Sequence, residues 1–152
     1  MNHQKLLHMN LNQQVAVLTI RLLLGLFFLM QGIGKVFKFG VENVYRNFFY
    51  GTYNEILPAF LLKLTAYYTS YVEFLGGILL ILGLFRNYTL YAFASVLVIV
   101  SFGHGLVEPI WDLSHVMYRA ILLIALLLLP DYWDRFSLDQ LLRKKSSGIG
   151  FK

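Results

Sequence analysis

Long apolar blocks, separated by short polar segments, dominate the chain. Three of them cover about residues 14–34, 66–85 and 88–107, and a fourth covers about 115–130. A helix rises about 1.5 Å per residue, so roughly 20 apolar residues cross the roughly 30 Å hydrocarbon core of a bilayer. The pattern therefore predicts four transmembrane helices.

The connections between the later blocks are short. Arg86 and Asn87 join the second block to the third, and Glu108–Ser114, which contains Pro109, joins the third to the fourth. Short loops place consecutive helices side by side in opposite directions. We therefore predict an all-α integral membrane protein, an antiparallel four-transmembrane-helix bundle. Its membrane domain is residues 14–130, between a segment at 1–13 and a basic tail at 131–152.

An aromatic segment separates the first block from the second. Residues 37–65 are rich in phenylalanine and tyrosine and are interrupted by charged residues and Pro58. Aromatic side chains favour the head-group level of a bilayer, and the apolar run Ile56–Leu64 is too short to cross one. We expect this segment to lie at the interface.

Composition supports a membrane environment and narrows the chemistry. The chain of 152 residues is 58% hydrophobic and only 14% charged, whereas soluble domains are about one quarter charged. It has no cysteine, so disulfide and thiolate chemistry are excluded. The net charge of +5 comes from basic residues beside apolar blocks, without a nucleic-acid motif. The expected partner is the lipid bilayer, not nucleic acid.

Basic residues predict the orientation. An even number of spans puts both ends on one side, which also carries Lys5, Arg86, Arg135, Arg143, Lys144, Lys145 and Lys152. The opposite side carries Lys35, Lys38, Arg46 and Lys63. Loops rich in lysine and arginine stay in the cytoplasm. We expect a multi-pass protein of the cytoplasmic (inner) membrane with both termini cytoplasmic.

Three charged residues, Arg21, Glu73 and Arg119, lie inside the apolar blocks. A charge at this depth costs several kcal/mol unless it faces other helices or water. Helical spacing puts the first two, Arg21 and Glu73, on stripes of small or polar residues. The stripes are Arg21, Gly25, Phe28, Gly32 and Lys35; Ala66, Ser70, Glu73 and Gly77; and, in the third block, Ala94, Ser101, His104 and Glu108. Small residues let helices approach closely, so we expect the stripes to face one another.

Depth indicates which polar groups can meet. Glu73 and Arg119 lie about 10 Å and 6 Å below the outer ends of their helices, so they can form a structural ion pair; Lys35 is the alternative partner of Glu73. Further polar residues lie in the same outer third of the membrane domain and predict a pocket that opens outward. They are Gln31, Lys35, His104, Glu108 and His115. Arg21 stands apart in the inner half, as a structural or lipid anchor. Asp131, Asp134 or lipid phosphates are its candidate partners.

Two motifs resemble the DoxX family. Arg21-Leu22-Leu23-Leu24-Gly25, continuing to Gln31-Gly32-Ile33-Gly34-Lys35, resembles the arginine, glycine and Gly-x-x-Lys pattern that opens these proteins. Glu73-Phe74-Leu75-Gly76-Gly77, with Leu80, Gly83 and Arg86, is similar to their glutamate, double glycine and basic run. The resemblance covers about Ile20 to Leu129. Many members have histidine where this chain has Gln31.

The resemblance implies a four-helix membrane protein whose founding relatives, DoxD and DoxX, belong to a thiosulfate:quinone oxidoreductase of the respiratory membrane. It leaves two functions open. In one, the protein is a small subunit, scaffold or assembly partner of a membrane complex, with other subunits or a second copy as partner. In the other, the outer pocket binds a quinone.

The quinone hypothesis assigns a role to each candidate residue. Glu73 exchanges protons, Arg119 tunes its proton affinity and His104 donates to a ring carbonyl, while Gln31 and Lys35 complete the binding site. No flavin, haem or dinucleotide motif is present, so electrons would come from a partner or the quinone itself.

Metal binding is the less favoured hypothesis. The residues His104, Glu108, Asp112 and His115 are of metal-ligand types, but Pro109 interrupts their helix and their spacing is unspecific. We predict no metal.

Overall fold

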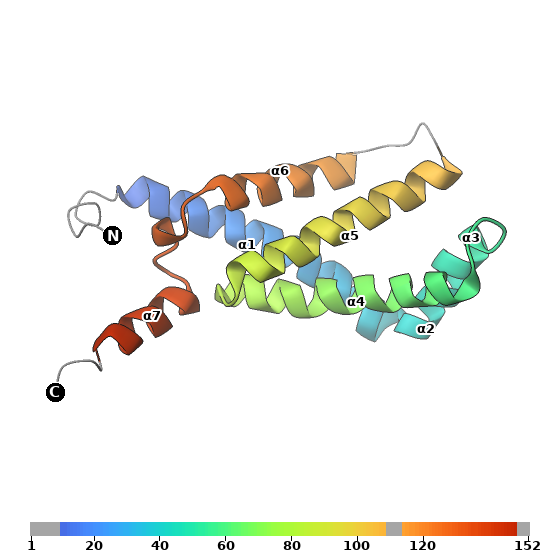
Figure 1. Ribbon diagram of the computed structural model, residues 1–152, viewed down its shortest axis with the longest axis horizontal. Helices are drawn as coiled ribbons and strands as arrows, with labels where there is room; N and C mark the ends of the chain where they lie inside the picture. The colour runs from blue at the N-terminus through green and yellow to red at the C-terminus, as the bar shows by residue number, and fades with distance from the viewer. Residues whose placement is uncertain (1–9, 109–113, 149–152) are drawn as a thin grey trace.

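The computed structural model describes residues 10–108 and 114–148, and every regular element in these ranges is helical. Four longer helices are α1 (Leu11–Ile33), α4 (Ala59–Leu82), α5 (Arg86–Val107) and α6 (Ser114–Leu128) (Figure 1). The shorter elements are the π-helical η2 (Gly34–Phe39) and η3 (Tyr45–Tyr50), α2 (Val41–Val44), α3 (Gly51–Tyr53), the 3-10 turn η4 (Asp131–Trp133) and α7 (Leu138–Gly148).

Three helical stretches are long and apolar enough to cross a membrane. They are Leu11–Phe39, which joins α1 to η2, and the helices α4 and α5. The apolar part of α6, Val116–Leu128, is shorter. The expected all-α membrane protein is thus confirmed, with three candidate spans among the described residues where the sequence predicted four.

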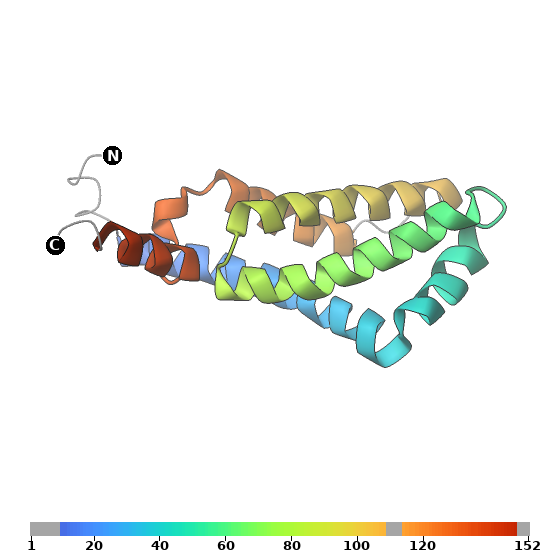
Figure 2. The same cartoon turned by 60° about the horizontal axis from the view of Figure 1, so that its bottom comes forward.

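The four longer helices share one apolar core. Helix α1 packs along α4, α4 contacts α5, and α6 contacts both α1 and α5. Consecutive long helices run in opposite directions along the long axis (Figures 1 and 2). The rings of Phe28 on α1 and Phe93 on α5 stack at the centre, with centroids 3.7 Å apart. The core also contains Val17, Leu24, Leu80, Leu90, Val96, Leu97, Val116, Leu123 and Leu126.

Glycines explain the close approach of α1 and α4. A Cβ added to Gly32 would lie 2.3 Å from the backbone nitrogen of Phe74, and one on Gly77 would lie 2.6 Å from that of Leu29. The helices can touch at these points only because both positions lack a side chain. The prediction that the first two stripes face each other is confirmed.

The predicted stripe on α5 is wrong. The buried residues of α5 beyond Arg86 are Thr89, Leu90, Phe93, Val96 and Leu97, whereas His104 and Glu108 are exposed and Ala94 and Ser101 half-buried. The reason is that α5 packs through large side chains. Its Phe93 ring fills the space above Gly76, where a Cβ would lie 2.7 Å from the ring.

Two helix boundaries also differ from prediction. Helix α4 begins at Ala59, directly after Pro58, so most of the expected interfacial run Ile56–Leu64 belongs to α4. Proline fits just before a first turn, where no backbone N–H is needed. Arg86 opens α5 instead of lying in a loop; the turn before it uses left-handed backbone at Gly83 and Phe85. Pro109 and Asp112 lie outside the described residues.

The segment Gly34–Tyr53, which we call the aromatic arm, continues beyond the end of α1, bends at Gly40 and runs toward the start of α4, which it contacts (Figure 2). Glu42 holds it there. The Glu42 carboxylate accepts a hydrogen bond of 3.1 Å from the Tyr67 hydroxyl and lies 3.4 Å from Lys63 Nζ, both on α4. We call this end of the molecule the arm end, and the opposite end, where α7 lies, the tail end.

Candidate functional site

An ion pair joins α1 to α4 near the arm end. Lys35 Nζ lies 2.7 Å from Glu73 Oε2 and 2.9 Å from Oε1. The Glu73 side chain is 2% exposed and that of Lys35 is 24% exposed. Because Lys35 sits on the π-helical turn after α1, its chain reaches from the rim to the buried carboxylate. Lys35, the alternative partner, is therefore in direct contact with Glu73.

A second polar contact joins α6 to α1. Arg119 Nη1 donates a hydrogen bond of 2.5 Å to Gln31 Oε1, and the guanidinium lies 5.7 Å from the centre of the Phe28 ring. Arg119 is 8% exposed, and its positive charge also attracts Glu73. A direct contact between Glu73 and Arg119 stays a prediction.

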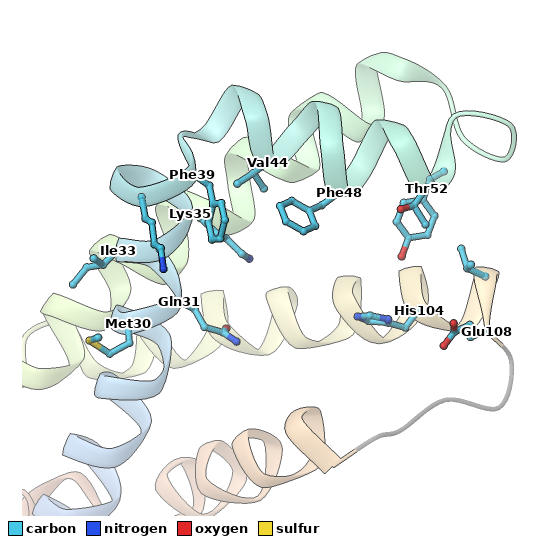
Figure 3. Close-up of a pocket in the computed structure, with 14 residues that line it drawn as sticks. Met30, Gln31, Ile33, Lys35, Phe39, Val44, Phe48, Thr52, His104 and Glu108 are labelled. Atoms are coloured by element: carbon cyan, nitrogen blue, oxygen red, sulfur yellow. The ribbon is translucent and has the colours of Figure 1, made fainter.

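An open cleft of about 860 Å³ lies beside these contacts, between the end of α1, the aromatic arm and the last turns of α5 (Figure 3). Of the residues predicted to form an outward pocket, Gln31, Lys35, His104 and Glu108 line it. The side chain of His115 lies outside the described residues. Glu73 and Arg119 do not line the cleft but contact two residues that do, Lys35 and Gln31.

The aromatic arm supplies the wall of the cleft that the sequence did not predict. Phe39, Val44, Phe48 and Thr52 face Gln31 and the end of α5 across it (Figure 3), and Tyr53 also lines it. The density of aromatic residues was the available signal. It could not say that the segment bends toward α4, because the bend depends on Gly40, whose φ is +78°, and on contacts with α4.

The cleft combines hydrogen-bond donors with aromatic faces. Burial, and after it the negative charge of Glu108, raises the pKa of the Tyr53 phenol, so this group stays protonated and can donate. The Lys38 ammonium lies 5.8 Å from the centre of the Phe39 ring. A flat, oxygen-bearing molecule could stack on such rings and accept hydrogen bonds from the polar groups.

The metal hypothesis requires four residues, and the structure describes the side chains of only two of them. His104 and Glu108 line the cleft, whereas Asp112 and the side chain of His115 lie outside the described residues. Within the described residues, no group of three or more His, Cys, Asp or Glu side chains could hold a metal ion.

Arg21 anchors the tail end. Its Nε lies 3.2 Å from Asp134 Oδ2, with both side chains 2% exposed. Its Nη1 donates to the carbonyls of Leu80 at 2.9 Å and Ile81 at 2.6 Å, at the end of α4, and Nη2 donates to that of Phe136 at 3.1 Å. Of the candidate partners, Asp134 is the one in contact, and the tail end holds several polar contacts where the sequence predicted an isolated arginine.

Arg86 anchors the end of α6 in the same way, and the sequence analysis did not predict this role. Its guanidinium contacts Asp131 at 2.8 Å and donates to the carbonyls of Leu126 and Leu129. The last carbonyls of a helix lack partners within it, and leaving them unpaired in hydrocarbon is costly. Because Arg86 follows an apolar block, the sequence suggested only a loop cation.

An all-helical chain with several membrane-length apolar helices, cross-linked by buried charges, is a small integral membrane protein. A family model described as DoxX matches residues 16–105, from α1 through the aromatic arm and α4 into α5. The protein belongs to the DoxX family, as its arginine and glutamate motifs suggested. Comparisons with curated proteins and with solved structures gave no match.

Proposed function

We propose that this protein is a small, non-catalytic subunit, scaffold or assembly partner of a membrane complex. One observation carries the proposal: the three charges inside the apolar blocks all join helices. Glu73 contacts Lys35, Arg119 contacts Gln31, and Arg21 contacts Asp134. Buried pairs of this kind fix helix register, and breaking one is strongly destabilising. Helices held rigidly in this way give other subunits a fixed surface.

Membrane placement is part of the proposal. Helix α6 makes a fourth crossing although its 15 residues extend only about 22 Å, since local thinning of the bilayer tolerates a short span. The aromatic arm lies at the interface, where Phe37, Phe39 and Phe48 are about half exposed or more. The tail end is cytoplasmic because it carries most of the basic residues. A reporter after Lys152 should then be cytoplasmic and one near Asn47 outside, and a reversed pair of signals would refute this orientation.

Purification in a mild detergent tests the scaffold function. Mass spectrometry of the purified sample should find a second subunit, or a second copy of this chain, in a fixed ratio that survives dilution. A chain that behaves as a monomer and brings no subunit with it, even after cross-linking in the native membrane, would contradict the proposal.

The cleft favours a second function, the binding of a quinone head group. It is large enough for a substituted ring, and Gln31, Lys35 and His104 are its candidate donors. Glu73, the candidate proton carrier, would exchange protons with the cleft through Lys35, with which it is paired.

Organic extraction of the purified protein tests quinone binding. His104→Leu should lower the quinone recovered, whereas Tyr91→Leu should not, because Tyr91 is exposed on α5 outside the cleft. Equal recovery from both variants and the wild type would exclude the cleft as the site.

A further inference from the structure

A second cavity lies beside the cleft. This groove, of about 580 Å³, runs between the first half of α4 and the last half of α5. Its walls are mostly apolar, formed by residues that include Leu57, Leu61, Leu62, Leu64, Val98 and Phe102. Tyr53 and His104 line both cavities, so the groove begins where the cleft ends.

The groove opens on the membrane-facing surface. Leu64, Val98 and Phe102 are each more than 60% exposed, and they lie on two helices long and apolar enough to cross a bilayer. The medium around such helices is hydrocarbon chain. A molecule can therefore enter the groove sideways, from the membrane, without passing through water.

A glycine keeps the junction between the two cavities narrow but unfilled. Gly103 lies on α5 opposite the Tyr53 phenol, and an added Cβ would lie 3.4 Å from the Tyr53 hydroxyl oxygen. Any longer side chain would project into the space beside the phenol. Two residues further on, no such constraint holds: among the described residues, no atom lies within 4 Å of a Cβ added to Gly105.

We propose that cleft and groove are two parts of one site for an amphipathic lipid, with an oxygen-bearing head group in the cleft and a single hydrocarbon chain in the groove. The head accepts hydrogen bonds from Lys35, Gln31 or His104, and the chain packs on the leucines of α4 and on Val98. The inference rests on the proposed binding of a head group in the cleft, and adds the chain and its entry from the bilayer. A prenylated quinone and a phospholipid share this chemistry.

Photolabelling in lipid nanodiscs tests the site. Two probes are used, a prenylated quinone and a phospholipid, each with a diazirine near the head or in the chain, and labelled peptides are mapped by mass spectrometry. Head diazirines should label the segment around Gln31 and Lys35, and chain diazirines should label Leu61–Thr65 and Val98–Phe102. Each probe is competed with its unlabelled parent molecule, the quinone or the phospholipid. The parent molecule that abolishes both the head and the chain labelling is the ligand.

Matched variants locate the junction. Gly103→Leu should abolish chain labelling of the groove, whereas Gly105→Leu, the same change on the same helix, should leave it intact. Leu64→Trp, at an exposed position that fills the groove from the membrane side, should also abolish it. This variant retains the test if Gly103→Leu fails to fold, as judged by helical content and gel filtration.

The outcomes separate this inference from the one on which it rests. Head labelling in the cleft without chain labelling in the groove would overturn the two-part site and leave head-group binding standing. Groove labelling that neither parent competes would identify ordinary surrounding lipid and overturn the two-part site as well. Absence of all labelling in the cleft would overturn both.

Discussion

Removing Lys35 should destabilise the protein more than removing Glu73. The carboxylate is 2% exposed and receives the Lys35 ammonium on both oxygens, at 2.7 and 2.9 Å. Lys35→Met leaves that carboxylate buried without its contacting cation, which costs about 3–5 kcal/mol. Glu73→Gln leaves a lysine that is already 24% exposed and can turn toward the surface, so we expect about 1.5–3 kcal/mol, the range for a lost hydrogen bond to a charged group.

A double-mutant cycle measures the interaction itself. Lys35→Met with Glu73→Gln removes both charges, so the cost of the double variant should be below the sum of the two single losses, with a coupling free energy of about 2–3 kcal/mol. The parallel cycle of Glu73 with Arg119→Leu should give a smaller coupling, because the described contact of Arg119 is with Gln31.

The assay is reversible unfolding by SDS in mixed micelles, followed by circular dichroism. Lys63→Met serves as the control, because Lys63 and Glu42 lie 3.4 Å apart and both side chains are substantially exposed. This substitution should change the free energy of unfolding by less than about 0.5 kcal/mol. Additive losses in the Lys35 cycle would refute the argument, as would a coupling larger in the Arg119 cycle.

Three further predictions concern the rest of the molecule. Gly32→Leu should separate α1 from α4 and cost several kcal/mol. Gly34→Leu, with no described atom within 4 Å of an added Cβ, should be nearly neutral in the same unfolding assay. Arg21→Lys should destabilise by about 2–4 kcal/mol because one ammonium cannot serve four acceptors, while exposed Arg135→Lys should not; equal stability of the two would contradict the anchor. Hydrogen bonds from Arg46 and then Tyr67 lower the pKa of Glu42, so its hold on the aromatic arm is complete above its ordinary pKa of 4.5 and is lost as pH falls through the lowered value. Protease cleavage of the aromatic arm should therefore increase in the wild type as Glu42 becomes protonated in acid. In Glu42→Gln, cleavage should not change over the same pH range.

Local sequence patterns predicted the features that depend on one helix face. The spacing of Gly25, Gly32 and Gly77 requires only regular helices, and the packing of α1 on α4 follows it. The same rule failed on α5 because Phe93 stacks on Phe28, a choice that depends on the size of partner side chains and not on the residues of α5 alone.

The parts of the site that were missed or left open depend on contacts between distant segments. The sequence named Lys35 only as the alternative partner of Glu73, because the contact depends on the π-helical turn after α1, which no pattern marks. Tyr53 joins the cleft only because the aromatic arm bends at Gly40 and packs on α4. Arg86 is indistinguishable in sequence from a loop cation until α6 ends beside it.

The anchor at Arg21 also has a consequence for biosynthesis. Arg21 enters the membrane in the first helix, but Phe136, one of its acceptors, is 115 residues further along the chain, and Asp134 is almost as far. At roughly 5–20 residues per second, the ribosome needs on the order of 10 seconds to make the intervening segment. An unpaired arginine at the centre of a span costs about 2.5–3.5 kcal/mol during insertion. We therefore expect the first helix to hold Arg21 toward the membrane surface until the carbonyls of Leu80 and Ile81 have been made, and the anchor to be complete only after Asp134 and Phe136 have been synthesised.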